Sequence, residues 1–288
     1  MSPPGQAGVA ALFAALVLSI NLGQGSILSS DDALYAQMAR EMSQGGAWLT
    51  AYWLGEAVFE KPPILLWILR CVGPFFGWSD AALRLPGILG ASCCVYYGSR
   101  FVLANRPGWL SAFSMPIMLL CTVTVCFNAR RPMTDILLCA SIIASLWYAK
   151  GVIEGGGGRS SMRLGLAAGL GVMTKSVAMG PTILVIGACL LAARRFKETV
   201  LVCVIALFIV APWHIAMTAE HGAVFWDVYL GYHIGERISG PLVGSAPWTI
   251  YLETLWSLDA LIGVALLVGL MTYVVVERGW APRLIGGT

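Results

Sequence analysis

Long apolar runs recur along the whole of this sequence, and they constrain its fold more than any other feature. A transmembrane helix needs about 20 mostly apolar residues, and the runs predict about eight such spans. The predicted spans are residues 8–24, 81–103, 108–128, 135–150, 162–174, 177–193, 198–217 and 254–276. Charged residues make up 11% of the chain, whereas soluble chains average about 25%. We therefore expect an all-α integral membrane protein in which residues 1–288 form a single polytopic domain.

Three further features narrow the class of protein. The formal charge of +3 is not gathered into a basic run, so nothing indicates nucleic-acid binding. The eight cysteines lie within or beside apolar runs and lack C-x-x-C spacing, which favours buried thiols over disulfides or metal ligands. The first 25 residues lack a basic start and a small-residue cleavage site, so we expect a retained membrane anchor.

The charges between the predicted spans indicate an orientation. With a cytoplasmic N-terminus, the inside loops carry ten basic residues and three acidic ones. The basic residues are Arg100, Arg106, Lys150, Arg159, Arg163, Arg194, Arg195, Lys197, Arg278 and Arg283, and the acidic ones are Glu154, Glu198 and Glu277. The outside then holds 18 − 10 = 8 basic and 15 − 3 = 12 acidic residues. Because cytoplasmic loops carry an excess of Lys and Arg, we expect this topology, with most carboxylates outside.

The first predicted outside loop, residues 25–80, is longer than a connection between two spans needs. It begins with "SSDDALYAQMAREM", in which Ser29 and Asp32 have the spacing of a helix capping box. Asp31 and Tyr35 lie one helical turn apart and share a face. The adjacent carboxylates fit either a capped helix start or a chemical site at the membrane surface. The two interpretations are compatible, because a capped helix holds a carboxylate rigidly.

A second stretch of this loop, "VFEKPPILLWILRCVGPFFGW", joins a charged pair to an apolar segment. Glu60 and Lys61 directly precede two prolines, which favour an extended or turn conformation just upstream. Residues 64–78 are too short to span a bilayer and contain an arginine and a proline. We expect an interfacial helix there.

Charged residues also mark the outer ends of later spans. "NARRPMTDILL" contains Arg130, Arg131 and Asp135, and "GLGVMTKSVAMGP" contains Lys175. These cations can snorkel to the membrane surface. However, arginines on the outer side oppose the orientation bias, which favours a partner for them, either Asp135 or an anionic ligand. An ionisable group in an apolar stretch, such as Lys175, is functional by default. The last outside loop, 214–250, contains His214, His221, His233, Glu236 and Arg237.

The combined outer face therefore carries both acids and cations at a membrane boundary. Carboxylates can deprotonate an acceptor or hold a divalent metal ion. Cations beside the bilayer can hold a phosphate whose lipid tail stays in the membrane. Such a face suits a substrate that is half lipid and half anion.

At these residues the sequence resembles the GT-C type glycosyltransferases that use polyprenyl-phosphate sugars. The likeness is to the 4-amino-4-deoxy-arabinose lipid A transferases and the dolichyl-phosphate-mannose-protein mannosyltransferases. The matching pieces occur in the family's order over about residues 20–255. They are "DDALY" with "REM", "FEKPP", "ALRLP", "NARRPMTD", "GLGVMTKS", "APWHIAM" and the H-x-x-x-R element of "GYHIGER". "FEKPP" and the ordered set are the most specific of them.

The resemblance implies a GT-C type bundle of about eight transmembrane helices, with juxtamembrane helices in the first outside loop. It implies that Asp31 is the catalytic base or acceptor-orienting carboxylate and that Asp135 is a second essential acid, with Asp32 as a further catalytic candidate. Glu60 and His233 occupy positions that can ligate a divalent metal ion in the arabinose-transferase branch.

The resemblance also implies a set of substrate-binding residues. Lys61, Arg130 and Lys175 would contact the donor phosphate, and Tyr35 and Arg237 would complete the site. The expected reaction is an inverting transfer of a sugar from a polyprenyl (undecaprenyl or dolichyl) phosphate to a lipid A, glycan or protein acceptor. It would take place on the extracytoplasmic face of a bacterial inner membrane.

Three departures from the family and two other functions stand beside this expectation. Asp32 follows the first Asp where Glu is common, and Leu34 occupies a position where the arabinose branch usually has arginine. The chain also ends after about eight spans where relatives continue, so we expect a truncated member. A transporter or flippase is one alternative. Transporters place ionisable residues near the bilayer midplane, often within inverted repeats, whereas here the acids lie in the predicted outside loops, the middles of most spans are uncharged and no internal repeat is visible. The other alternative is an inactive membrane protein that serves as an assembly subunit.

Overall fold

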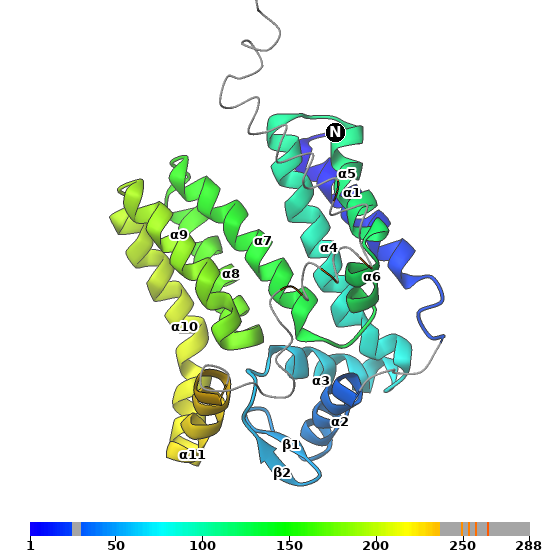
Figure 1. Cartoon of the computed structure of the whole chain (residues 1–288), viewed down its shortest axis with the longest axis vertical. Coiled ribbons are helices and arrows are strands. Elements are labelled where there is room, and N and C mark those ends of the chain that lie inside the picture. The colour runs from blue at the N-terminus through cyan, green and yellow to red at the C-terminus, as the bar shows by residue number, and fades with distance from the viewer. Residues whose placement is uncertain (25–29, 237–248, 250–252, 254–256, 258–263, 265–288) are drawn as a thin grey trace, which may run out of the picture.

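The computed structural model describes residues 1–24 and 30–236, together with the single positions 249, 253, 257 and 264. Its described part is a bundle of long helices with a smaller layer of helices and a hairpin at one end (Figure 1). The bundle helices are α1 (Pro3–Ser19), α4 (Asp80–Asn105), α5 (Trp109–Cys121), α6 (Val123–Ala129), α7 (Thr134–Ile153), α8 (Gly157–Lys175), α9 (Gly180–Ala192) and α10 (Phe196–His221). This arrangement is that of a helical integral membrane protein.

By length and composition, four helical stretches among the described residues can cross a membrane. They are Asp80–Asn105, Thr134–Ile153, Gly157–Ala192 and Phe196–His221. A fifth results if α5 and α6 count as one span, although they meet at 85° because Thr122 between them is extended. α1 is a shorter apolar helix, and most of the predicted span 254–276 lies outside the described residues. The count of eight spans therefore stays a prediction.

The stretch Gly157–Ala192, counted once by length and composition, is not one straight crossing. It reverses direction between α8 and α9, so the predicted spans 162–174 and 177–193 form two antiparallel segments, and Arg195 after α9 reaches back to the carbonyl of Ile153 before α8. The reversal occurs at the short 3-10 helix η1 (Ser176–Met179), where Ser176 has a positive φ of 38°. Leu164 near the start of α8 packs with Ile186 and Leu190 near the end of α9. Positive φ is unusual for a residue with a side chain, and here it permits the tight turn.

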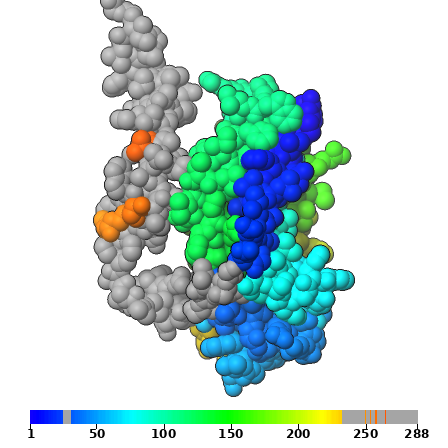
Figure 2. Space-filling model, turned by 90° about the vertical axis from the view of Figure 1, so that its right-hand side faces the viewer, coloured from blue at the N-terminus to red at the C-terminus, as the bar shows by residue number. Residues whose placement is uncertain are grey.

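Small residues let the bundle helices approach closely. In α8, Gly165 faces α10, where an added Cβ would lie 2.7 Å from the Cβ of Ile205. In α1, Ala7, Ala10 and Ala14 are fully buried in one apolar cluster with residues of α4. Close backbone approach through small residues is the usual basis of helix packing in membranes. Figure 2 shows the dark-blue α1 lying on the face of the bundle, above the lighter blue residues of the end layer.

The end layer is built from the first predicted outside loop. It comprises α2 (Ser30–Gln44), the antiparallel strands β1 (Ala51–Trp53) and β2 (Glu56–Val58), and α3 (Ile64–Phe76). The helix expected over residues 64–78 is thus present as α3. Arg70 of α3 donates hydrogen bonds to the carbonyls of Met42 and Ala47, which ties α3 to the end of α2.

The last described elements pack against the far end of α10. They are α11 (Ala223–Trp226) and the π-helix η2 (Asp227–Glu236). An aromatic cluster joins them to the end layer, with Phe59, Trp213, Phe225 and Tyr229 as buried members. The Oγ1 atom of Thr50 lies 2.8 Å from Nε2 of His221, so the hairpin also contacts the end of α10. These contacts fix the end layer against the α8–α10 side of the bundle.

Candidate active site

A cavity of about 400 Å³ opens where the end layer meets the bundle. Its wall comes from α2, from the segment before α3, from the start of α7 and from the turn between α8 and α9. The lining residues are Asp31, Glu60, Lys61, Pro62, Met133, Asp135, Lys175, Ser176, Val177, Ala178 and Pro181. Five of the residues proposed from the sequence, Asp31, Glu60, Lys61, Asp135 and Lys175, therefore share one cavity, although the sequence separates them by up to 144 positions (175 − 31).

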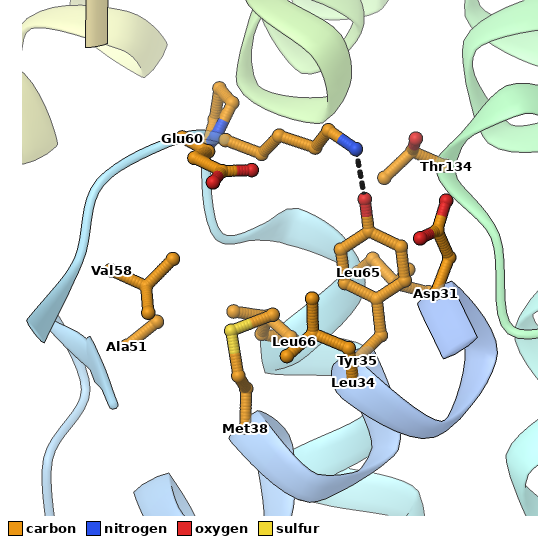
Figure 3. A pocket seen from close by; sticks show the side chains of 12 residues that line it. Asp31, Leu34, Tyr35, Met38, Ala51, Val58, Glu60, Leu65, Leu66 and Thr134 are labelled. Atoms are coloured by element: carbon orange, nitrogen blue, oxygen red, sulfur yellow. Dashed lines mark hydrogen bonds between the residues drawn. The ribbon is translucent and has the colours of Figure 1, made fainter. Parts of the chain in front are cut away.

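A smaller cavity of about 60 Å³ adjoins the first and shares Asp31, Glu60, Lys61 and Pro62 with it. Lys61 donates a hydrogen bond to the hydroxyl of Tyr35, the dashed line in Figure 3. Figure 3 also shows the Asp31 carboxylate and the Tyr35 hydroxyl pointing to the same side of α2, as their one-turn spacing predicts. Apolar side chains of α2, α3 and the hairpin close the opposite wall.

The electrostatics of this corner keep Tyr35 neutral. Burial raises the pKa of the Tyr35 hydroxyl, and the nearby Asp31 carboxylate raises it further, against an opposing effect of Lys175. A neutral tyrosine that accepts a hydrogen bond from a lysine still has its own proton to donate. Tyr35 can therefore act as a hydrogen-bond donor in the cavity, but not as a base.

Lys175 and Asp135 form an ion pair on the cavity wall, with 2.6 Å between Nζ and Oδ1. Lys175 ends α8 and Asp135 lies in the first turn of α7. Each charge thus complements the dipole of its own helix, which favours cations at C-terminal ends and anions at N-terminal ends. Both side chains keep part of their surface exposed to the cavity, 29% for Lys175 and 45% for Asp135.

Asp32 has a different environment from Asp31. Its carboxylate is 2% exposed and accepts two hydrogen bonds from Arg131, each 2.8 Å long, from Nε and Nη2. Arg130 points elsewhere and donates to the carbonyl of Asn21 at 3.0 Å, beyond the end of α1. Neither Asp32 nor Arg130 is among the lining residues of the two cavities. The two adjacent arginines of "ARRP" project in different directions. Arg130 contacts the end of α1, and Arg131 contacts α2.

Several residues of the sequence interpretation lie partly or wholly outside the described residues. They are Ser29, Arg237, Glu277, Arg278 and Arg283, which are not described, and His233 and Glu236, whose backbone lies in η2 but whose side chains are not described. The capping box of Ser29 and Asp32 therefore stays a prediction, and the structure shows Asp32 engaged with Arg131.

The described residues do not assemble the metal site that the resemblance implies. Among the side chains that the structure describes, which do not include those of residues 232–236, no group of three His, Cys, Asp or Glu residues lies close enough to hold a metal ion. Glu60 lines the cavity, but its expected partner His233 belongs to the side chains that are not described. We therefore derive no chemical step through a metal ion.

Sequence reasoning missed two residues of this region, Ser176 and Thr134, which line the cavities. It expected a partner for the arginines of "NARRP" from their place on the predicted outer side, against the orientation bias. For Arg131 the expected partner Asp135 is wrong, because Arg131 pairs with Asp32 while Asp135 pairs with Lys175. Ser176 directly follows Lys175, and Thr134 directly precedes Asp135. A hydroxyl residue beside a charged one is too common in sequences to indicate a site.

Fold and site together define a polytopic helical membrane protein whose charged cavity lies at one end of the bundle. The family model described as dolichyl-phosphate-mannose-protein mannosyltransferase matches residues 60–215, more than half of the 288 residues. The chain belongs to this family of GT-C type proteins.

Curated relatives agree with this membership, and solved structures share the fold. Proteins of Serratia proteamaculans and Erwinia tasmaniensis, both named undecaprenyl phosphate-alpha-4-amino-4-deoxy-L-arabinose arabinosyl transferase, are 25% and 29% identical over 95% and 94% of this chain. ArnT from Cupriavidus metallidurans has the same fold. Bound to undecaprenyl phosphate it superposes with a TM-score of 0.70 at 20% identity, and in the apo state with 0.71 at 19% identity.

The match covers most of this chain but only part of each relative. It covers 50% of the Serratia and Erwinia proteins. For ArnT it covers 85% of this chain and 47% of the ArnT chain in the bound form, and 86% and 47% in the apo form. The chain thus spans about half the length of the curated relatives it matches.

Proposed function

We propose that this chain carries the catalytic cavity of a membrane glycosyltransferase. The donor is a sugar linked to a polyprenyl phosphate, and the acceptor is a lipid A, glycan or protein group on the extracytoplasmic face. One observation carries the proposal: Asp31, Asp135, Lys61 and Lys175 line a single cavity at the end of an apolar bundle. The names of the relatives, which include undecaprenyl phosphate, support this donor class.

In the proposed reaction Asp31 accepts the proton of the acceptor nucleophile. That nucleophile attacks C1 of the sugar, a new bond to C1 forms, and the bond between C1 and the phosphate oxygen breaks. The bond electrons leave with the polyprenyl phosphate, and the configuration at C1 inverts. A positioned general base contributes about 10²–10⁴-fold to such a step. Asp31 suits this role better than Asp32, whose two carboxylate oxygens are both engaged by Arg131.

The two lysines of the cavity hold the departing phosphate. Lys175 already balances Asp135 across 2.6 Å, and Lys61 donates to Tyr35, so both ammonium groups are positioned before a ligand arrives. Pre-positioned donors stabilise developing charge without reorganisation during the reaction. Tyr35, held neutral, adds a further hydrogen-bond donor.

An apolar groove beside the cavity gives the lipid chain of the donor a place. It has a volume of about 530 Å³ and is lined by residues of α3, α4, α7 and α8, among them Ile64, Leu137 and Thr174. Thr174 directly precedes Lys175, and Leu137 lies two residues after Asp135 in α7. A phosphate at Lys175 would therefore leave its polyprenyl tail within reach of an apolar surface.

The test is sugar transfer by the protein reconstituted in liposomes that contain the sugar-linked polyprenyl phosphate and an acceptor. We expect free polyprenyl phosphate and glycosylated acceptor to appear together in equal amounts. Movement of the intact donor between leaflets without cleavage would instead establish the flippase alternative. Binding of the donor without either event would leave the inactive-subunit alternative.

A further inference from the structure

An arginine without a carboxylate partner lies near the end of the bundle opposite the cavity. α4 and α7 run side by side away from the cavity (Figure 1), and Arg100 lies in the last two turns of α4. Its side chain is partly buried, and α4 is long and apolar enough to cross a membrane. Within the described part of the chain, no Asp or Glu forms an ion pair with Arg100. A charge inside a membrane helix is costly unless it is paired, so Arg100 needs an anionic partner from elsewhere.

Aromatic side chains hold the guanidinium of Arg100 in place. Its Cζ atom lies 4.6 Å from the ring centroid of Trp147 in α7 and 5.9 Å from that of Tyr96 in α4. Nη1 donates a hydrogen bond to the hydroxyl of Tyr96 at 3.2 Å. Among the described residues, no other acceptor binds this side chain. Because a guanidinium carries several N–H donors in a fixed fork, most of them remain available to a ligand.

Lys150 brings a second cation to the same ring. Its Nζ atom lies 5.9 Å from the ring centroid of Trp147, and Phe101 fixes that ring by an edge contact at 5.1 Å. Like charges beside one ring repel each other, and an anion between them relieves the repulsion. Lys150 also pairs with Glu154, whose side chain is 59% exposed. Arg100, Lys150 and Glu154 together carry a net charge of one positive unit.

A phosphodiester with one negative charge matches this group. The fork of Arg100 suits two phosphate oxygens, and the ammonium of Lys150 adds a further donor. A zwitterionic head group fits less well, because the cation that it carries beside its phosphate is repelled by both side chains.

The depth of Arg100 fits the phosphate of a membrane lipid. α4 has 26 residues and is therefore about 39 Å long, whereas the hydrocarbon core of a bilayer is about 30 Å thick. Centred in the bilayer, α4 extends about 4–5 Å beyond the core at each end. An arginine in its last two turns thus reaches the head-group level when its side chain points toward the helix end.

We propose that Arg100 and Lys150, held against Trp147, bind the phosphate of an anionic glycerophospholipid in the leaflet opposite the cavity. Basic pockets between membrane helices bind anionic head groups in this way. The site is separate from the catalytic cavity, since α7 carries Asp135 in its first turn and Lys150 in its last. The inference therefore goes beyond the proposed function and does not depend on it.

The test counts the lipids that remain bound to the detergent-purified protein in native mass spectrometry, over a titration with phosphatidylglycerol or phosphatidylcholine. We expect wild type to bind one phosphatidylglycerol about tenfold more tightly than phosphatidylcholine. Arg100→Gln should weaken the binding of phosphatidylglycerol about tenfold, the range of a charge-assisted hydrogen bond. It should leave the binding of phosphatidylcholine unchanged.

Two further variants make the test specific. Arg106→Gln removes the same charge at an exposed position just after α4 and should leave both affinities unchanged. Glu154→Gln releases Lys150 from its exposed partner and should tighten the binding of phosphatidylglycerol about twofold. Because this last change is at the surface, it tests the proposal even if Arg100→Gln does not fold.

Three results would overturn the inference. Wild type could bind both lipids equally well. Arg100→Gln and Arg106→Gln could weaken phosphatidylglycerol equally, in which case the general basic surface attracts the lipid. Inorganic phosphate could displace the bound phosphatidylglycerol from wild type, in which case the site takes a soluble anion. None of these results bears on sugar transfer at the cavity, which is measured separately.

Discussion

Asp32 and Arg131 lie 99 positions apart in the sequence and form a bidentate ion pair that joins α2 to the turn before α7. Both hydrogen bonds are 2.8 Å long, and the carboxylate is 2% exposed. The pair therefore fixes the start of α2, and with it Asp31, against the segment that carries Asp135. In this arrangement Asp32 positions the neighbouring Asp31.

The first prediction concerns this pair. Asp32→Asn or Arg131→Gln should destabilise the fold by about 3–5 kcal/mol, because each leaves a charged partner unpaired in a largely buried place. Thermal unfolding in detergent measures the effect. Glu154→Gln is the control, since it breaks the exposed Lys150–Glu154 pair and should cost less than about 1 kcal/mol. Equal losses from the buried and the exposed pair would contradict the positioning role.

The second prediction concerns Lys175. Lys175→Gln should weaken the binding of undecaprenyl phosphate about tenfold, since it removes a charge-assisted hydrogen bond. Asp135→Asn should strengthen that binding, because it releases the ammonium group from its partner at 2.6 Å. Both changes should shrink as salt is added, since ions screen the exposed side of the pair. Lys197→Gln, an exposed lysine at the other end of the bundle, is the control and should change nothing.

The third prediction is a pH dependence at Tyr35. Burial and the Asp31 carboxylate raise the pKa of Tyr35 above its ordinary value of 10.0. A raised folded-state pKa contributes stability that is complete below the unfolded pKa and is lost as the pH rises above it. Wild type should therefore lose its stability advantage over Tyr35→Phe as the pH rises from about 8 to about 11. Unfolding temperatures of both proteins at each pH provide the measurement, and a constant difference would refute the shift.

The fourth prediction is the topology. Arg195 donates to the carbonyl of Ile153 at the end of the bundle opposite the cavity. A single cysteine at Glu60 should react with an impermeant thiol reagent from outside the cell, and one at Arg195 only after the membrane is opened. The eight native cysteines must first be replaced. Labelling of both positions from the same side would overturn the extracytoplasmic placement of the cavity.

Much of the site could be predicted because its residues are chemically conspicuous. Charged residues that interrupt or border apolar runs are costly in a membrane and are functional by default. This applies to Asp31, Lys61, Asp135 and Lys175. Hydropathy also indicated the α-helical class and the short helix before α4. Such local signals need no knowledge of which helices are neighbours.

The rest depended on tertiary packing that one sequence does not encode locally. Which arginine of "ARRP" meets Asp32 is decided by the turn before α7. The boundary between the predicted spans 162–174 and 177–193 agrees with the reversal at Ser176, because Lys175 interrupts the apolar run there. The bend at Thr122, in contrast, arises from one backbone conformation within a continuous apolar run, so hydropathy predicted a single span over 108–128. The hydrogen bond between His214 and Tyr229 joins α10 to η2 and leaves no periodic signature in the sequence.

The last prediction separates the two roles of the acids at the start of α2. Asp31→Asn keeps the size of the side chain, and asparagine is well tolerated at helix starts, so the fold should lose only about 0.5 kcal/mol. The proton acceptor is gone, however, and sugar transfer should fall about 10²–10⁴-fold. Unfolding temperature and transfer rate, measured on one preparation, give both values.

Asp32→Asn should have the opposite effect, with a large loss of stability and a smaller loss of transfer rate. It should lower the unfolding temperature strongly, and the fraction that stays folded should keep more activity than Asp31→Asn, because the Asp31 carboxylate is still present. Glu56→Gln, an exposed carboxylate of β2, is the matched control and should alter neither quantity. Near-normal transfer by Asp31→Asn would remove Asp31 as the base and leave it only the structural role that its place in the first turn of α2 provides.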